Sequence, residues 1–92
     1  MNPNRLLGLF LELVRIESPS RREAAMAARC KRELADLGFE VRFDDSGTRT
    51  GSDSGNLIAR LPGTVAGSIV LSAHMDTVEP CEGIVPVVKG DV

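Results

Sequence analysis

Aromatic residues are scarce in this sequence, which has three phenylalanines among 92 residues and neither tryptophan nor tyrosine. Many proteins bind single-stranded nucleic acid by stacking its bases on aromatic side chains, so no such platform is expected. Positive charge is not in excess either, because 11 Lys and Arg stand against 13 Asp and Glu, a formal net charge of -2 at pH 7. Nucleic acid is therefore not expected as a partner.

Long apolar runs are also missing, and none approaches the roughly 20 residues that a membrane-spanning helix needs. The apolar stretch 6–14 is broken by Gly8 and Glu12, and no small-residue cleavage site follows it. Neither a membrane anchor nor a secretory signal is predicted. The only cysteines, Cys30 and Cys81, fit neither a metal-binding spacing nor a disulfide framework. A reduced, cytoplasmic setting is the default interpretation.

A first helix is predicted over residues 2–16, where apolar side chains recur at three- and four-residue steps. Asn2 suits the N-cap and Pro3 the first helical position. Pro19 disfavours helical geometry at the residue before it, so the helix should end ahead of this point.

A second helix is predicted over residues 20–37. Ser20 and Glu23 have the spacing of a capping box, in which each side chain bonds the other residue's backbone amide. Gly38 suits a left-handed C-terminal cap. Cys30 falls on the apolar stripe of this helix, which indicates a core residue rather than a redox centre.

Three strands are predicted next. Residues 39–43 alternate apolar and polar side chains, residues 56–61 form a short apolar run before a Pro-Gly turn, and residues 68–72 form a β-branched run typical of a buried central strand. The polar stretch 44–55 is predicted as a loop, with its aspartates Asp44, Asp45 and Asp53 as surface charge. Helices followed by strands indicate an α/β layer structure.

The end of the sequence suggests a strand at residues 85–88 that enters a tight turn at residues 89–91. A hairpin would then lack its returning strand. On this ground we expect the 92 residues to be a truncated piece of a longer chain.

The only histidine, His74, follows the 68–72 run, at the kind of strand end where sites form in open α/β sheets. Asp76 lies two residues further on and, along an extended backbone, points to the same side. Its carboxylate can hold one ring nitrogen of His74, fix the tautomer and leave the other nitrogen for a metal ion. The pair is a candidate corner of a zinc site.

The same residues have simpler interpretations. A lone histidine near a strand end is often a hydrogen-bonded structural residue, and Asp76 could cap the following turn through backbone amides. One histidine also supplies too few ligands, because zinc needs at least three from the protein. Nearby, Cys81 is interpreted as a tolerated loop residue rather than a soft ligand. Glu79 and Glu82 are not assigned as ligands.

Residues 71–78, Leu-Ser-Ala-His-Met-Asp-Thr-Val, resemble the first metal-binding motif of the peptidase T-like dizinc aminopeptidases. These belong to a clan that includes aminoacylases, succinyl-diaminopimelate desuccinylases and related carboxypeptidases. Residues 10–20 resemble the opening helix of the family and its Ser-Pro-Ser exit, and residues 55–63 resemble the strand and turn before the motif. The likeness spans nearly the whole sequence, in the same order and spacing.

This resemblance implies an α/β fold with two N-terminal helices and a mixed β-sheet, the truncated start of a zinc-exopeptidase catalytic domain. His74 matches a histidine that binds one of two zinc ions, and Asp76 matches its catalytic partner, the aspartate that orients it. The remaining ligands, the general base and a lid domain that supports dimerisation lie later in family members. Residues 1–92 would thus be the N-terminal part of the catalytic domain, with the rest and the lid domain absent.

The full-length parent is expected to be a cytoplasmic homodimer that hydrolyses short peptides, as a tripeptide aminopeptidase does, while the 92 residues alone are expected to be inactive. Deacylation of N-acyl amino acids is the alternative chemistry of the clan. A non-catalytic fragment or scaffold is an alternative of another class, and a small binding module has no positive support in the sequence.

Overall fold

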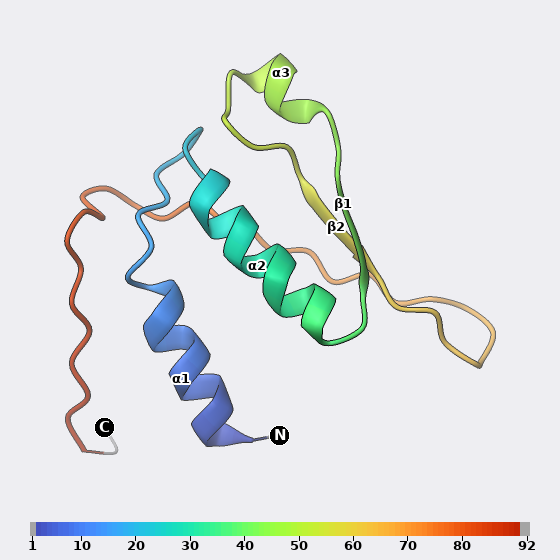
Figure 1. The fold of residues 1–92 in the computed structure, drawn as a ribbon, viewed down its shortest axis with the longest axis horizontal. Coiled ribbons are helices and arrows are strands. Elements are labelled where there is room, and N and C mark those ends of the chain that lie inside the picture. Colours follow the sequence, from blue (N-terminus) through green and yellow to red (C-terminus); the bar gives the residue numbers. More distant parts are fainter. Residues whose placement is uncertain (1, 91–92) are drawn as a thin grey trace.

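The computed structural model describes residues 2–90 and contains three helices and two strands in the order α1, α2, β1, α3, β2. Their bounds are α1 Pro3–Leu13, α2 Ala24–Asp36, β1 Glu40–Phe43, α3 Ser46–Thr50 and β2 Leu57–Arg60. Figure 1 shows α2 lying between α1 and the two strands, with α3 at the far end of the hairpin. The predicted α/β class is confirmed.

Helix α1 begins as predicted, because the Asn2 side chain accepts the amides of Asn4 at 3.1 Å and Arg5 at 3.2 Å. Pro3 occupies the first turn, where its missing amide proton costs nothing. The helix ends at Leu13, earlier than the predicted residue 16, and the chain then turns toward the Ser-Pro-Ser segment.

Helix α2 begins at Ala24 rather than at the predicted residue 20, so the expected capping box is wrong. Glu23 occupies the N-cap without a side-chain cap bond, and Ser20 bonds another part of the chain. The cap comes instead from Asp53, whose Oδ1 accepts the Ala24 amide at 3.1 Å. Asp53 is therefore not merely surface charge. Gly38 has the predicted left-handed geometry, with φ +95°.

The two strands pair in antiparallel fashion, with Glu40 opposite Arg60 and Phe43 opposite Leu57. Within residues 2–90 the sheet has these two strands, so it is antiparallel and not the mixed sheet expected. The stretch between them is not a simple loop, because residues 46–50 form α3.

Asp44, also expected to be surface charge, joins the two ends of this stretch. Its carboxylate accepts the Ser46 hydroxyl at 2.6 Å, the Ser46 amide at 3.0 Å, and the Asn56 amide and side chain at 2.7 and 2.9 Å. These bonds, led by that of the Ser46 hydroxyl, hold the pKa of Asp44 far below its usual range.

The run 68–72, predicted as a central strand, has no strand partner among the described residues. Figure 1 shows it leaving the hairpin and passing α2 toward the segment that precedes that helix. Ile69 and Leu71 are 90% and 92% exposed. A β-branched run favours a strand, but a strand forms only where a second backbone completes its hydrogen bonds. Residues 85–88 likewise form no strand, and the turn expected at 89–91 lies partly outside the described residues.

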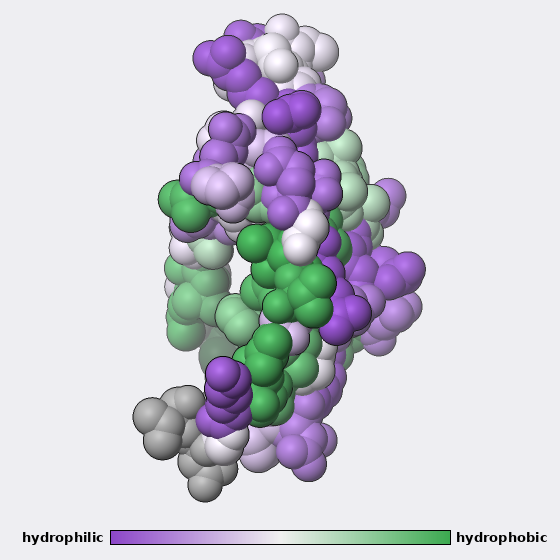
Figure 2. Space-filling model, turned by 90° about the vertical axis from the view of Figure 1, so that its left-hand side faces the viewer, coloured by the Kyte–Doolittle hydropathy of each residue, from purple (hydrophilic) through white to green (hydrophobic). Residues whose placement is uncertain are grey.

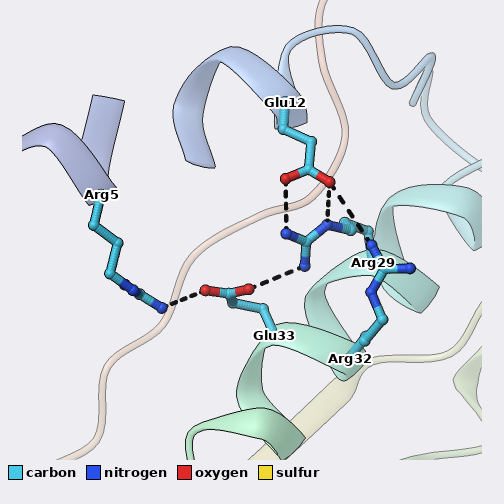
Figure 3. A network of polar contacts seen from close by, with 5 residues as sticks. All are labelled: Arg5, Glu12, Arg29, Arg32 and Glu33. Carbon is cyan, nitrogen blue, oxygen red and sulfur yellow. Dashed lines mark hydrogen bonds and ion pairs between the residues drawn. The ribbon is translucent and has the colours of Figure 1, made fainter. Parts of the chain in front are cut away.

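An ion-pair network joins α1 to α2 (Figure 3). The Arg29 guanidinium binds both Glu12 carboxylate oxygens at 2.8 Å and donates to Glu33 at 3.1 Å. Arg5 pairs with the other oxygen of Glu33, and Arg32 lies 3.7 Å from Glu12. The bonds from Arg29 lower the pKa of Glu12. The network links the two helices through their side chains.

Few side chains are buried. Those that are include Met26 and Ala27 on α2, Cys81 and Ser18. Cys81 was expected to be a tolerated loop residue, but its side chain is one of these. Cys30 is only half-buried, and burial raises the pKa of its thiol. Both thiols are free. Apolar side chains form a band across one face of the molecule (Figure 2). No helix of residues 2–90 has the length and apolar character of a membrane span.

Candidate metal and catalytic site

His74 and Asp76 lie together, at the end of the exposed run that follows the hairpin. The His74 Nδ1 atom is 2.9 Å from Asp76 Oδ1 and 2.8 Å from the Asp76 backbone oxygen. Both neighbours are acceptors, so Nδ1 carries the proton and donates it. The other ring nitrogen, Nε2, then presents its lone pair, which is the form of histidine that binds a metal ion.

The Asp76 carboxylate has a second partner on a distant segment. The Ser20 hydroxyl donates a hydrogen bond to Asp76 Oδ2, the oxygen that does not face His74. This bond, followed by that of His74, lowers the pKa of Asp76 below its ordinary value. At neutral pH the group is therefore a carboxylate, and it accepts one hydrogen bond at each of its two oxygens.

The backbone around His74 is tied to the Ser-Pro-Ser segment by Ser18. The Ser18 hydroxyl donates to the Met75 carbonyl at 2.8 Å, and the Ser18 carbonyl accepts the Thr77 amide at 2.7 Å. The Thr77 hydroxyl adds a longer bond of 3.4 Å to the same carbonyl. Ser18 has no exposed surface, whereas Met75 is half-buried and Thr77 is exposed, so these bonds are shielded from water on the Ser18 side.

An open cleft of about 470 Å³ borders the pair, lined by Ser20, His74, Asp76, Thr77, Val78 and Glu79. The His74 side chain is 84% exposed, whereas that of Asp76 is 38% exposed. The imidazole therefore projects into open space, and the carboxylate that holds it lies behind.

The described residues offer a metal ion one oriented ligand, the Nε2 atom of His74. Within residues 2–90, no group of three or more His, Cys, Asp and Glu side chains is placed to hold an ion. Zinc needs at least three protein ligands, so His74 fits one position of such a site and the described residues do not complete it. Glu79 borders the cleft without joining a ligand group, and Cys81 is buried.

The sequence pointed to His74 and Asp76 but missed Ser18 and Ser20. The available signal is the Ser-Pro-Ser exit of the first helix, from which the sequence predicts only a helix boundary and, at Ser20, a helix cap. Only the return of the chain to this segment makes its hydroxyls part of the site.

No family model matches this chain. It is 46% identical over 90 residues to an uncharacterized protein of Bacillus subtilis strain 168, named YqjE, covering 97% of the chain and 24% of that protein. It is 35% identical over 79 residues to a probable carboxypeptidase of Paracoccidioides brasiliensis, covering 82% of the chain and 18% of that protein. The chain thus spans about a quarter or less of the length of these relatives.

Among solved structures, the fold matches the aminopeptidase PepT from Bacillus cereus ATCC 10987, with a TM-score of 0.90 and 41% sequence identity. The match covers 98% of this chain and 25% of PepT. The α/β fold of the chain is that of the start of a peptidase. In sequence and structure the chain corresponds to the N-terminal portion of a peptidase T-like protein, as the motifs predicted.

Proposed function

We propose that these residues form the first part of the catalytic domain of a zinc-dependent peptidase that removes residues from the amino end of short peptides. The observation that carries the proposal is the His74–Asp76 pair. Its 2.9 Å contact leaves Nε2 for a metal ion, in a chain whose fold matches an aminopeptidase. In this proposal His74 binds one of two zinc ions, and Asp76 orients the ring.

Zinc, when bound, would lower the pKa of a bound water and polarise a peptide carbonyl. The residues of this chain have a simpler task. Asp76 keeps the Nδ1 proton of His74 in place, which fixes the tautomer and the direction of the Nε2 lone pair. The charge of Asp76 also makes the imidazole a stronger electron donor.

A larger catalytic domain around these residues is part of the proposal. The radius of gyration is 15.2 Å, whereas a compact domain of this length would have about 12 Å. Large apolar side chains stand exposed on the run 68–72, with Ile69, Val70 and Leu71 all above 85%. Surfaces of this kind are usually covered by protein. The remainder of the domain and a dimerising lid domain would supply the cover and the other ligands.

The first experiment compares the natural gene product that contains these residues with its His74→Ala variant. We expect bound zinc and hydrolysis of tripeptides by the wild type, and loss of most zinc and activity in the variant. Asp76→Ala should lower turnover at least tenfold while circular dichroism stays unchanged. Wild-type turnover in Asp76→Ala would remove that residue from the mechanism.

Blocked substrates separate the candidate reactions. An aminopeptidase cleaves a C-amidated tripeptide but not an N-acetylated one. The reverse result would favour a carboxypeptidase, the name carried by the Paracoccidioides relative. Release of acetate from an N-acetyl amino acid would favour a deacylase.

We further propose that the 92-residue chain is inactive by itself, because one imidazole does not hold zinc firmly. Added zinc should produce no tripeptide hydrolysis above that of its own His74→Ala variant. The same proposal places the full protein in the cytoplasm as a homodimer. The free thiols of Cys30 and Cys81 are in keeping with a reducing compartment.

A further inference from the structure

The Asp76 carboxylate is held at both of its oxygens. Oδ1 faces His74 Nδ1 at 2.9 Å, and Oδ2 accepts the Ser20 hydroxyl. In a His-Asp pair without other contacts, the aspartate carboxylate can rotate about χ2 and break its hydrogen bond to the imidazole. A hydroxyl on the opposite oxygen removes that freedom, because the carboxylate plane is then fixed from both ends.

Ser20 is itself firmly placed. It lies in a turn in which the Arg22 amide donates to the Pro19 carbonyl at 2.9 Å. The next residue, Arg21, has φ +73°, a left-handed geometry unusual for a side chain of this type. The Arg21 carbonyl accepts the Asp53 amide at 3.0 Å, which ties the turn to the segment after α3.

Ser20 has two simpler explanations, and the contacts argue against both. It is not needed as the cap of α2, because Asp53 accepts the Ala24 amide. Nor is it needed to fasten the site backbone to the Ser-Pro-Ser segment, because Ser18 does so through hydrogen bonds to Met75 and Thr77. The remaining contact of the Ser20 hydroxyl is its hydrogen bond to the Asp76 carboxylate, the group that orients His74.

We propose that Ser20 is a positioning residue, whose hydroxyl holds the Asp76 carboxylate in the rotamer that fixes the tautomer and direction of the His74 ring. This inference rests on the proposed function for its catalytic consequence. Its geometric consequence, the state of the His74 ring, does not depend on activity.

The test uses the natural gene product with three variants. Ser20→Ala removes the hydroxyl, and Ser20→Thr keeps it. Thr64→Ala removes an exposed hydroxyl from the turn after β2 as a control. We expect Ser20→Ala to lower kcat and zinc affinity about tenfold, the size of effect seen when a ligand loses its outer support. KM and the thermal midpoint should stay close to wild type, and Ser20→Thr should recover most of the loss.

A second measurement, made on the metal-free protein, accompanies the kinetic experiments. Nitrogen NMR of the metal-free protein, well above the ordinary pKa of histidine, reports which ring nitrogen of His74 carries the proton. Wild type and Ser20→Thr should hold it on Nδ1, whereas Ser20→Ala should raise the share on Nε2. An unchanged tautomer in Ser20→Ala, or a Ser20→Thr variant no better than Ser20→Ala, would overturn the inference.

The kinetic and NMR measurements together distinguish failure of the proposed function from failure of the inference about Ser20. If the wild type binds no zinc and cleaves no peptide, the proposed function fails. The tautomer shift would still support the positioning of His74 through Ser20. If the enzyme is active and Ser20→Ala matches it in kcat, zinc affinity and tautomer, the inference alone fails.

Discussion

Ser18 donates its hydroxyl to the carbonyl of Met75 at 2.8 Å, although 57 positions separate the two residues in the sequence. Ser18 has no exposed surface, and Met75 lies between the histidine and the aspartate of the candidate site. The bond joins the exit of the first helix to the backbone that carries the site. It makes the position of His74 depend on a residue near the N-terminus.

Ser18→Ala should destabilise the fold by about 1 kcal/mol, because the half-buried Met75 carbonyl would lose its side-chain donor. Urea unfolding measures the change. Thr64→Ala, at an exposed position, should leave the midpoint unchanged. Equal stability of Ser18→Ala and wild type would mean that water or another donor replaces the hydroxyl.

Gly55→Ala should lower the free energy of unfolding by more than the addition of one methyl group usually does. A Cβ atom at Gly55 would lie 2.1 Å from the Asp44 carbonyl oxygen, so the backbone around α3 must shift. We expect a loss of about 1–3 kcal/mol, typical of overpacking.

Gly8→Ala is the matched control for this prediction. A Cβ atom at Gly8, inside α1, meets nothing within 4 Å. Alanine should therefore stabilise the helix by about 0.5–1 kcal/mol. Similar effects of the two substitutions would contradict the packing described around Gly55.

Asp44 should make the fold sensitive to acid. Its hydrogen bonds with Ser46 and Asn56 lower the folded-state pKa below the ordinary 3.8. Their stabilisation is fully present above that unfolded value and is lost as the pH falls through the folded one. Stability should therefore hold down to about pH 5 and decline below about pH 4.

Asp44→Asn should be less stable at neutral pH and lose less stability on acidification. Asp45→Asn is the control, because the Asp45 side chain is 79% exposed and lies 3.8 Å from its partner Arg49. Thermal midpoints measured from pH 7 to pH 3 give the pH dependence of stability for each of the two variants and for wild type. An Asp44→Asn profile as steep as that of wild type would assign the acid sensitivity to other carboxylates.

Arg29→Met should loosen the contact between α1 and α2, because Arg29 binds Glu12 and Glu33 together. The effect should be modest, a few degrees in thermal midpoint, since ion pairs near water contribute little. High salt should lower the wild-type midpoint toward that of the variant, because salt screens these charges.

Arg49→Met offers a comparison, since Arg49 makes one exposed ion pair with Asp45. Its midpoint should match that of wild type at all salt concentrations. A salt response of Arg29→Met as large as that of wild type would show that the network does not stabilise the helix contact.

Local patterns predicted the elements whose causes are local. The apolar spacing and the Asn2 cap predicted α1, Gly38 predicted the end of α2, and two strands came within one residue of their observed bounds. The approach of His74 to Asp76 was also predictable, because a spacing of two residues along an extended chain brings the side chains to one side. Their roles in metal binding and catalysis remain predictions.

Two of the errors depend on distant parts of the chain, one on a contact that forms and one on a strand pairing that does not. Ser20 has the sequence signature of a helix cap, yet its hydroxyl serves Asp76, and the cap of α2 comes from Asp53. The run 68–72 has the composition of a buried strand, yet a strand requires a partner that composition does not specify.

The sequence by itself determined the positions of α1, most of α2 and the two paired strands, and which histidine and carboxylate meet, because hydrogen bonds and side-chain directions over a few residues decide these features. The tertiary structure alone decided that the Ser-Pro-Ser segment supports the site. A hydroxyl satisfies whichever acceptor the folded chain brings within reach, and for Ser18 and Ser20 those acceptors come from Met75 and Asp76.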